Sequence, residues 1–178
     1  MKNYDHKKIE KKWQKENNYA FIDAQNIFLE TKKVGLDIDW RAFRKFLYDI
    51  FSIKKAFIFI GYLPKNQKIY ENYKKSDFKI IFKEVVADSN GKLKGNVDAE
   101  LVLESMKRLD EYDKAVIVSS DGDFACLVKY LKENKKFRAV ISPTRKSCSY
   151  LLRKAVGGRI VYLENSKNKF EKQTKSRA

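Results

Sequence analysis

The amino-acid sequence predicts an α/β protein, a three-layer α/β/α sandwich around a central, mainly parallel β-sheet. Short apolar runs alternate along the chain with segments whose apolar residues recur at helical spacing. The runs are apolar throughout instead of alternating with polar residues, which is typical of strands covered on both faces. The chain has 178 residues, of which 43% are hydrophobic, enough for one domain with a sizeable core. Strands and helices in alternation form a parallel sheet with helices on both sides.

The first half of the chain is expected to contain three strands and two helices. Residues 19–22 and 55–63 are short runs rich in aromatic and β-branched side chains, and Pro64 ends the second run. Between them, residues 39–52 repeat apolar side chains at helical spacing behind Asp39, a favoured helix-capping residue. By the same criteria, an exposed helix and the third strand are expected at residues 66–76 and 78–86.

The second half continues this alternation. Residues 87–95 are polar, contain two glycines and are expected to form a loop. Residues 97–112 carry apolar side chains at helical spacing, and residues 114–118 end in the run Ala-Val-Ile-Val, a fourth strand. A helix, a fifth strand, a short helix and a last strand complete the series, at residues 123–134, 138–141, 147–156 and 160–163.

These elements and the distribution of charge divide the chain into three parts. Residues 1–18 are polar and dense in charge, and we expect them to form an N-terminal arm. Residues 19–164 hold all the expected strands and helices, and therefore form the domain. Residues 165–178 are rich in lysine and poor in apolar side chains, so we expect a basic, flexible tail.

The net charge points to a polyanionic partner. The formal charge is +16, from 39 basic and 23 acidic side chains. Such a surplus attracts phosphates, which neutralise the repulsion between the basic groups and release counterions on binding. A nucleic acid is the favoured partner, and an anionic membrane surface is the competing one.

Cysteine, histidine and hydropathy exclude several classes of protein. Cys126 and Cys148 are far apart in the sequence, and the single histidine, His6, lies in the N-terminal arm. A disulfide framework and a zinc site are therefore not expected, and a reducing, cytoplasmic setting is favoured. No segment approaches the roughly 20 consecutive apolar residues that span a bilayer, so no membrane-spanning segment is expected and a membrane is not the favoured partner.

Acidic residues directly follow two of the expected strands. Asp23 comes at the end of the first strand, and Asp121 and Asp123 come after the fourth, at a turn into the next helix. Because ligands of parallel sheets bind beyond the carboxyl ends of the strands, these side chains should lie at one ligand-binding edge. Asp98 opens a helix after the glycine-containing loop, and the strand order can bring it to the same cleft.

A cluster of carboxylates favours a bound cation. Crowded carboxylates repel one another, and a cation removes that repulsion. Ligand sets made only of oxygen favour hard ions, so Mg²⁺ or Mn²⁺ is expected, and such ions assist the attack of water on a phosphodiester. Helix capping is the competing explanation for Asp98 and Asp123, because aspartate is a favoured residue at helix starts.

Three short blocks of the sequence resemble the signature blocks of NYN domains. They are Phe21-Ile22-Asp23-Ala24-Gln25-Asn26, Lys94-Gly95-Asn96-Val97-Asp98 and Ser119-Ser120-Asp121-Gly122-Asp123-Phe124. The blocks occur in the family's order, and the resemblance runs from about Tyr19 to Leu163. It is closest to the bacterial LabA-like branch of the PIN-like ribonuclease superfamily. The resemblance implies a PIN-like fold and metal-dependent endonuclease activity on RNA, with Mg²⁺ or Mn²⁺.

The resemblance also implies roles for individual residues. Matching the blocks assigns catalytic and metal-binding roles to Asp23, Asp98, Asp121 and Asp123. Asn26 would orient a ligand or a water molecule, and Ser120 matches a small residue beside the site. Glu104 stands where the family often has a second aspartate, but six residues turn about 240° around a helix. Glu104 is therefore expected, with Ser120, beside the metal ligands and not among them. PIN-like proteins often pair, so the resemblance is compatible with a homodimer.

Basic residues should hold single-stranded or structured RNA around the acidic cleft. They come from the loop before Asp98, the end of the fifth strand and the helix after it: Lys92, Lys94, Arg145, Lys146 and Arg153. Tyr62 and Tyr150 are candidates for stacking on unpaired bases.

Two other functions fit the same pattern. One is a non-catalytic RNA-binding or regulatory module on the same fold. The other is a nucleotide-sugar transferase that uses Asp121-Gly122-Asp123 as its metal motif, although the chain is short for such an enzyme and the positive charge has no role there.

Overall fold

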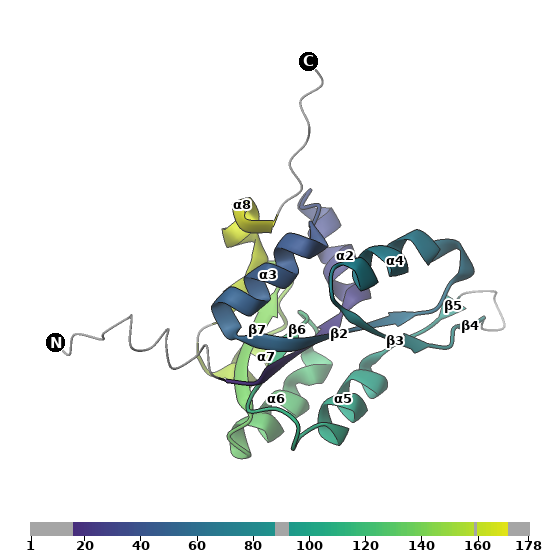
Figure 1. Ribbon diagram of the computed structural model, residues 1–178. Helices are drawn as coiled ribbons and strands as arrows, with labels where there is room; N and C mark the ends of the chain where they lie inside the picture. Colours follow the sequence, from purple (N-terminus) through teal and green to yellow (C-terminus); the bar gives the residue numbers. More distant parts are fainter. Residues whose placement is uncertain (1–15, 88–92, 159, 171–178) are drawn as a thin grey trace.

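The computed structural model describes residues 16–87, 93–158 and 160–170. At its centre is a six-stranded sheet in the order β3-β2-β1-β6-β7-β8, in which every neighbouring pair is parallel. Helices cover both faces of this sheet (Figure 1), so the predicted three-layer α/β fold is confirmed. The strands are β1 (Asn18–Asp23), β2 (Ile53–Gly61), β3 (Lys79–Lys83), β6 (Ala115–Val118), β7 (Phe137–Ser142) and β8 (Val161–Tyr162). No helix in the described parts of the chain is long and apolar enough to cross a bilayer.

The two helical layers enclose two apolar cores. One face of the sheet is covered by α2 (Ala24–Lys33), α3 (Trp40–Phe51), α4 (Gln67–Lys75) and α8 (Lys167–Phe170) (Figure 1). The other face is covered by α5 (Asp98–Lys107), α6 (Ala125–Glu133) and α7 (Tyr150–Val156). Along β1, Ala20 and Ile22 belong to the first core, whereas Tyr19 and Phe21 belong to the second. Because successive side chains of a strand point to opposite faces, a strand between two cores must be apolar throughout.

Helix α2 directly follows β1 and is not indicated by the sequence patterns. Its buried side contains Ala24, Ile27 and Thr31, and its outer side carries Phe28 and Leu29. Its apolar side chains therefore lie on both the buried and the outer side of the helix. The helix begins at Asp23, whose side chain accepts a hydrogen bond from the Asn26 N–H at 3.0 Å.

The region of residues 78–112 differs from the expectation in detail. Strand β3 ends at Lys83, before the expected end at residue 86. Within the expected loop, β4 (Val86–Ala87) and β5 (Leu93–Lys94) pair as a short antiparallel ladder (Figure 1). Helix α5 ends at Lys107 instead of residue 112.

The fold continues past residue 164, the expected start of the flexible tail. The 3₁₀ helix η3 (Leu163–Ser166) leads into α8, and the Phe170 side chain is 1% exposed. Its ring lies edge-on to Phe43 and Phe46, with centroids 5.7 and 5.4 Å away, and its carbonyl accepts a hydrogen bond from the Asp39 N–H at 2.8 Å. The expectation of a tail is therefore wrong for residues 165–170. Residues 1–15 of the expected arm and residues 171–178 lie outside the described residues.

Candidate metal centre

The sheet brings two strand-end aspartates to one edge. Strands β1 and β6 are parallel neighbours, with Ile22 paired to Val118. Asp23 is the last residue of β1, and Asp121 follows β6 at the start of the 3₁₀ helix η2 (Gly122–Phe124). Helix α5 packs against both β1 and η2, so its first residue, Asp98, arrives at the same edge.

Three carboxylates gather into one compact group there. One carboxylate oxygen from each of Asp98, Asp121 and Asp123 lies within 4.8 Å of the other two. Asp98 and Asp121 are half-buried, and Asp123 is exposed. A group of this size, made only of oxygen ligands, fits a hard divalent cation such as Mg²⁺ or Mn²⁺.

Asp23 lies deeper than this triad and is not part of it. Its side chain is 6% exposed, and its second oxygen accepts a hydrogen bond from the Ser119 hydroxyl at 3.4 Å. Burial raises the pKa of Asp23 to about 6, the Asn26 N–H opposes that rise, and the charges of Asp98 and Asp121 add to it. Asp23 is therefore close enough to the triad to be affected by its charge.

The triad itself carries unbalanced negative charge. Burial is the main reason that the pKa of Asp98 is raised, and a hydrogen bond with Asn96 opposes the rise. The charges of Asp121, Asp123 and Glu100 raise it further. A bound cation would reverse the sign of the local field and remove this repulsion, so the residues present fit a divalent metal.

Helix capping does not explain Asp98 and Asp123. The residue that caps α5 is Val97, and Asp98 lies inside the helix. Capping belongs to the other pair: Asp23 caps α2, and Asp121 accepts a hydrogen bond from the Asp123 N–H at 3.0 Å to cap η2. The competing explanation from the sequence is thus wrong for the two residues to which it was applied.

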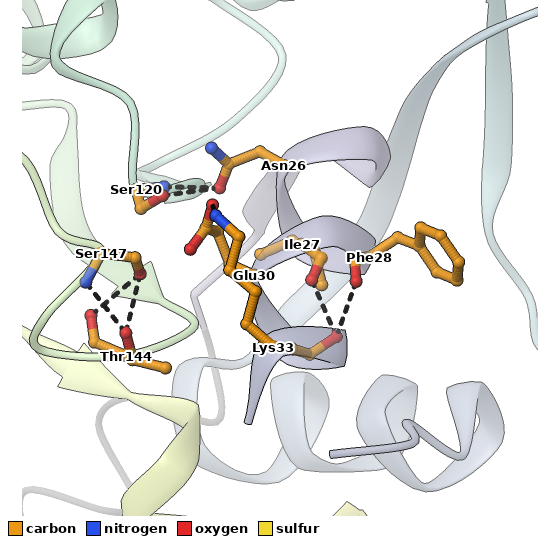
Figure 2. Close-up of polar contacts among 9 residues, drawn as sticks. Asn26, Ile27, Phe28, Glu30, Lys33, Ser120, Thr144 and Ser147 are labelled. Carbon is orange, nitrogen blue, oxygen red and sulfur yellow. Dashed lines mark hydrogen bonds and ion pairs between the residues drawn. The ribbon is translucent and has the colours of Figure 1, made fainter. Parts of the chain in front are cut away.

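Asn26 and Ser120 join α2 to the end of β6. The Asn26 side-chain oxygen accepts hydrogen bonds from both the N–H and the hydroxyl of Ser120, each at 2.9 Å (Figure 2). Because Ser120 precedes Asp121 directly, this double contact fixes the chain at the point where it enters the triad. Asn26 thus holds the segment that carries Asp121 from α2, and its expected role in orienting a ligand stays a prediction.

Ser119 is a site residue that the sequence reasoning did not single out. It is fully buried, and its hydroxyl donates to Asp23 while accepting a hydrogen bond from the Asp121 N–H at 3.2 Å. One hydroxyl thus connects the two strand-end aspartates. Its place at the end of an apolar strand, directly before Ser120, was the available signal, because a polar group there is buried and needs partners.

Two glycines in the segments that carry the acids lie where neighbouring segments approach closely. A Cβ atom at Gly122 would lie 2.5 Å from the Ser149 hydroxyl oxygen at the start of α7. A Cβ at Gly95 would lie 2.8 Å from a methyl group of Val85 and 3.6 Å from Gly61 at the end of β2. The absence of a side chain at Gly122 and Gly95 therefore sets the positions of the segments that carry Asp121 and Asp98.

Glu104 is not brought into the carboxylate group. It forms ion pairs within α5, with Lys107 at 2.9 Å and Arg108 at 2.6 Å. Glu100, two residues after Asp98, contributes to the local charge instead, and it pairs with Lys83 of β3.

The basic residues expected to bind RNA differ in their exposure and in the contacts that they already make. Arg145 and Lys146 are exposed just after β7, and the Arg145 N–H donates to Glu164 at 2.7 Å. The Arg153 guanidinium donates to the Cys148 carbonyl, at the start of its own helix. Lys92 lies outside the described residues, and Lys94 ends β5.

The acidic residues open onto a cleft of about 930 Å³. Asp23, Asp98 and Asp121 line it, and it extends from them between α2 and α4. The parallel sheet, the carboxylates at its carboxyl edge and this cleft place the chain in the class of α/β proteins with an acidic cluster beside a cleft.

Comparison with known proteins assigns the family. The model of the NYN domain matches residues 19–164, most of the chain, and the protein belongs to this family. It is 26% identical, over 142 residues, to the low amplitude and bright protein LabA of Synechococcus elongatus, covering 68% of this chain and 71% of that protein. A crystal structure of a protein of unknown function from Vibrio parahaemolyticus has the same fold, with a TM-score of 0.71 and 21% identity. That match covers 83% of this chain and 93% of the other.

Proposed function

We propose that this protein is a metal-dependent endoribonuclease that hydrolyses RNA phosphodiesters at the cluster of Asp98, Asp121 and Asp123. The observation that carries the proposal is the convergence of these three carboxylates at the carboxyl edge of the sheet, within 4.8 Å of one another. Membership of the NYN family supports a nuclease-type site, and the net charge of +16 supports a polyanionic substrate.

The residues divide into holding and positioning roles. Asp98, Asp121 and Asp123 would hold Mg²⁺ or Mn²⁺, with Asp23 as a fourth carboxylate on the buried side. A bound metal of this kind supplies Lewis-acid chemistry, which activates water and stabilises the negative charge that develops on the phosphate. Asn26, through Ser120, and the Ser119 hydroxyl keep the two strand ends in register, so that the carboxylates stay together without the cation.

The basic residues serve to bring RNA to an acidic site. Arg145 and Lys146 follow β7 at the same edge of the sheet as the triad, and both are exposed. Lys92, Lys94 and Arg153 stay in the proposal as further contacts to the RNA backbone. Such contacts bind the phosphates of an RNA of any base sequence, and they weaken as the salt concentration rises.

Cleavage assays with the purified full chain test this function. Single-stranded and hairpin RNAs are incubated with Mg²⁺ or Mn²⁺ and separated on denaturing gels. We expect internal cleavage that EDTA abolishes and that Asp121→Asn lowers by at least about a hundredfold, as expected for loss of a metal ligand. The matched control is Asp110→Asn, which removes an exposed carboxylate in the turn after α5, and it should cleave like the wild type.

The outcome also separates the catalytic function from a binding function. RNAs left intact with both metals, while a reference nuclease cuts them, would contradict the catalytic proposal. Salt-sensitive RNA binding that survives Asp121→Asn, without cleavage by the wild type, would establish the non-catalytic RNA-binding module instead.

A further inference from the structure

The outer face of α2 is unusually apolar for a helix surface. Gln25, Phe28, Leu29 and Lys32 follow one another at helical spacing on this face. The side chains of Phe28 and Leu29 are 56% and 47% exposed. Figure 2 shows the Phe28 ring projecting from α2 on the side away from Ser120 and Thr144. A large apolar pair left exposed on a helix marks a surface that contacts something else.

This face forms one wall of the cleft that begins at the acids. The opposite wall is α4, where Lys68, Ile69 and Asn72 line the cleft. Ile69 is 42% exposed, so both walls offer apolar surface to an occupant. The floor comes from the half-buried Trp40 and Ile60 and the buried Tyr73. The cleft is therefore an apolar groove that is continuous with the carboxylate cluster.

The groove combines three chemical features. Its walls are apolar and include an exposed aromatic ring. Side-chain amides lie along it, from Gln25, Asn66 and Asn72. Positive charge lies beside it, since Lys68 lines the groove and the Lys32 ammonium is 5.8 Å from the centroid of the Phe28 ring. Flat rings with polar edges, attached to phosphates, match all three features, and these are the unpaired bases of a nucleic acid.

We propose that the groove between α2 and α4 binds an unpaired nucleobase, stacked on Phe28, of the RNA strand whose phosphate lies at the acidic cluster. The proposal rests on the proposed function, because it takes the acids as the place of the phosphate. It makes the substrate single-stranded at this point. In a duplex each base face is covered by its neighbours, and its edges are paired, so a duplex can bring phosphate to the acids but no base into the groove.

A second copy of the chain is a weaker candidate for the groove. A protein with a net charge of +16 repels another copy of itself. The carboxylates at the end of the groove and the amides along it would also have to be desolvated by a protein surface. RNA instead uses the amides as hydrogen-bond donors and acceptors to base edges.

Binding measurements without cleavage test the groove. Asp121→Asn serves as the background, and fluorescence anisotropy compares a short labelled single-stranded RNA with a blunt duplex of the same length. We expect Phe28→Ala to weaken binding of the single strand about tenfold, the scale of one lost base stack, and to leave duplex binding within about twofold. Phe28→Trp should keep the affinity for the single strand, because it retains a stacking surface.

Tyr48→Ala is the matched control. Tyr48 of α3 is 51% exposed, and a lysine ammonium lies 4.9 Å from its ring centroid. Phe28 also has a lysine ammonium near its ring, but Tyr48, unlike Phe28, does not line the groove. We expect it to change neither affinity. Because both side chains are largely exposed, both variants should retain the thermal unfolding midpoint of the background.

Each outcome has a distinct meaning. Equal losses for single strand and duplex, or no loss with Phe28→Ala, would overturn the groove proposal. A monomer–dimer equilibrium in sedimentation that Phe28→Ala abolishes would also overturn it, since the occupant would be a second copy. Selective loss of single-strand binding, together with a wild-type protein that never cleaves RNA, would sustain the groove and refute the nuclease.

Discussion

The ends of strands β1 and β6 look alike in sequence and differ in the structure. Each ends in an apolar run followed by an aspartate that caps the next helical segment. Asp23, after β1, is 6% exposed and has a raised pKa, whereas Asp121, after β6, is half-buried and belongs to the carboxylate triad. The contrast teaches that strand-end placement brings a carboxylate to the edge of a sheet, but depth decides whether it joins the compact carboxylate group.

The largest expected effect is on metal binding, and it falls at the β6 end. Asp121→Asn removes a member of the triad and should weaken Mn²⁺ binding at least a hundredfold, on the order of the effect of losing a direct ligand. Asp23→Asn should weaken it about tenfold, as expected for a residue that supports the ligands from behind. Titration calorimetry with Mn²⁺ on the wild type and the two variants measures these affinities. If the two variants lose equal affinity, Asp23 binds the metal directly and the contrast is wrong.

The second difference is in the stability of the metal-free protein. Because folding raises the pKa of Asp23 from 3.8 to about 6, its ionisation opposes folding. As far as Asp23 determines it, the free energy of unfolding is highest below about pH 4, falls as the pH rises toward 6 and stays low above that pH. Asp23→Asn removes this loss and keeps a capping side chain, so it should stabilise the protein near pH 7 by up to about 3 kcal/mol.

Urea unfolding in EDTA, near pH 7 and near pH 4, measures this effect. The gain from Asp23→Asn should shrink at the lower pH, where the carboxyl is protonated in the folded state and, close to its unfolded pKa of 3.8, about half protonated in the unfolded state. A variant that is less stable than the wild type at both values would show that Asp23 is held by its hydrogen bonds more than it is penalised by burial.

The smallest of the three effects concerns the packing behind the β6 end. Gly122→Ala would place a methyl group 2.5 Å from the Ser149 hydroxyl oxygen, which accepts a hydrogen bond from the Leu151 N–H at the start of α7. We expect a loss of about 1–2 kcal/mol in chemical unfolding, the scale of overpacking. Gly158→Ala is the control, because its nearest neighbour would be a carbonyl oxygen 3.8 Å away. Equal stability of the two variants would mean that Ser149 moves aside at no cost.

Much of the fold could be predicted because strands buried on both faces have an unmistakable composition. The runs around Phe21, Phe57 and Ile117 are apolar throughout, and each is a central strand. Helix α2 was not predictable in this way, since its outer face carries Phe28 and Leu29, and an apolar outer face removes the periodic signal. The pairing of β4 with β5 was hidden because each strand has only two residues.

The sequence indicated which acidic residues gather at the candidate site better than it indicated how they are arranged there. All four aspartates lie at the carboxyl edge; the strand ends indicated this for Asp23, Asp121 and Asp123, whereas the position of Asp98 depends on how α5 packs. Their relative depth could not be read from the sequence, because it depends on which segments cover them. Helix α2 begins at Asp23 and helps to bury it, whereas α5 and η2 leave Asp98 and Asp121 half-buried and Asp123 exposed. Ser119 was missed for a related reason, since its role needs both strand ends at once.

The position of Phe170 has a consequence for how the protein is made. Its ring is the last described apolar group of the core that contains Phe43 and Phe46. A chain is synthesised from its amino end, so this core is incomplete until residue 170 has left the ribosome. A chain that stops at residue 164, where the family match ends, would expose those rings to chaperones and proteases. Loss of this one phenylalanine is therefore expected to mark a truncated chain for degradation.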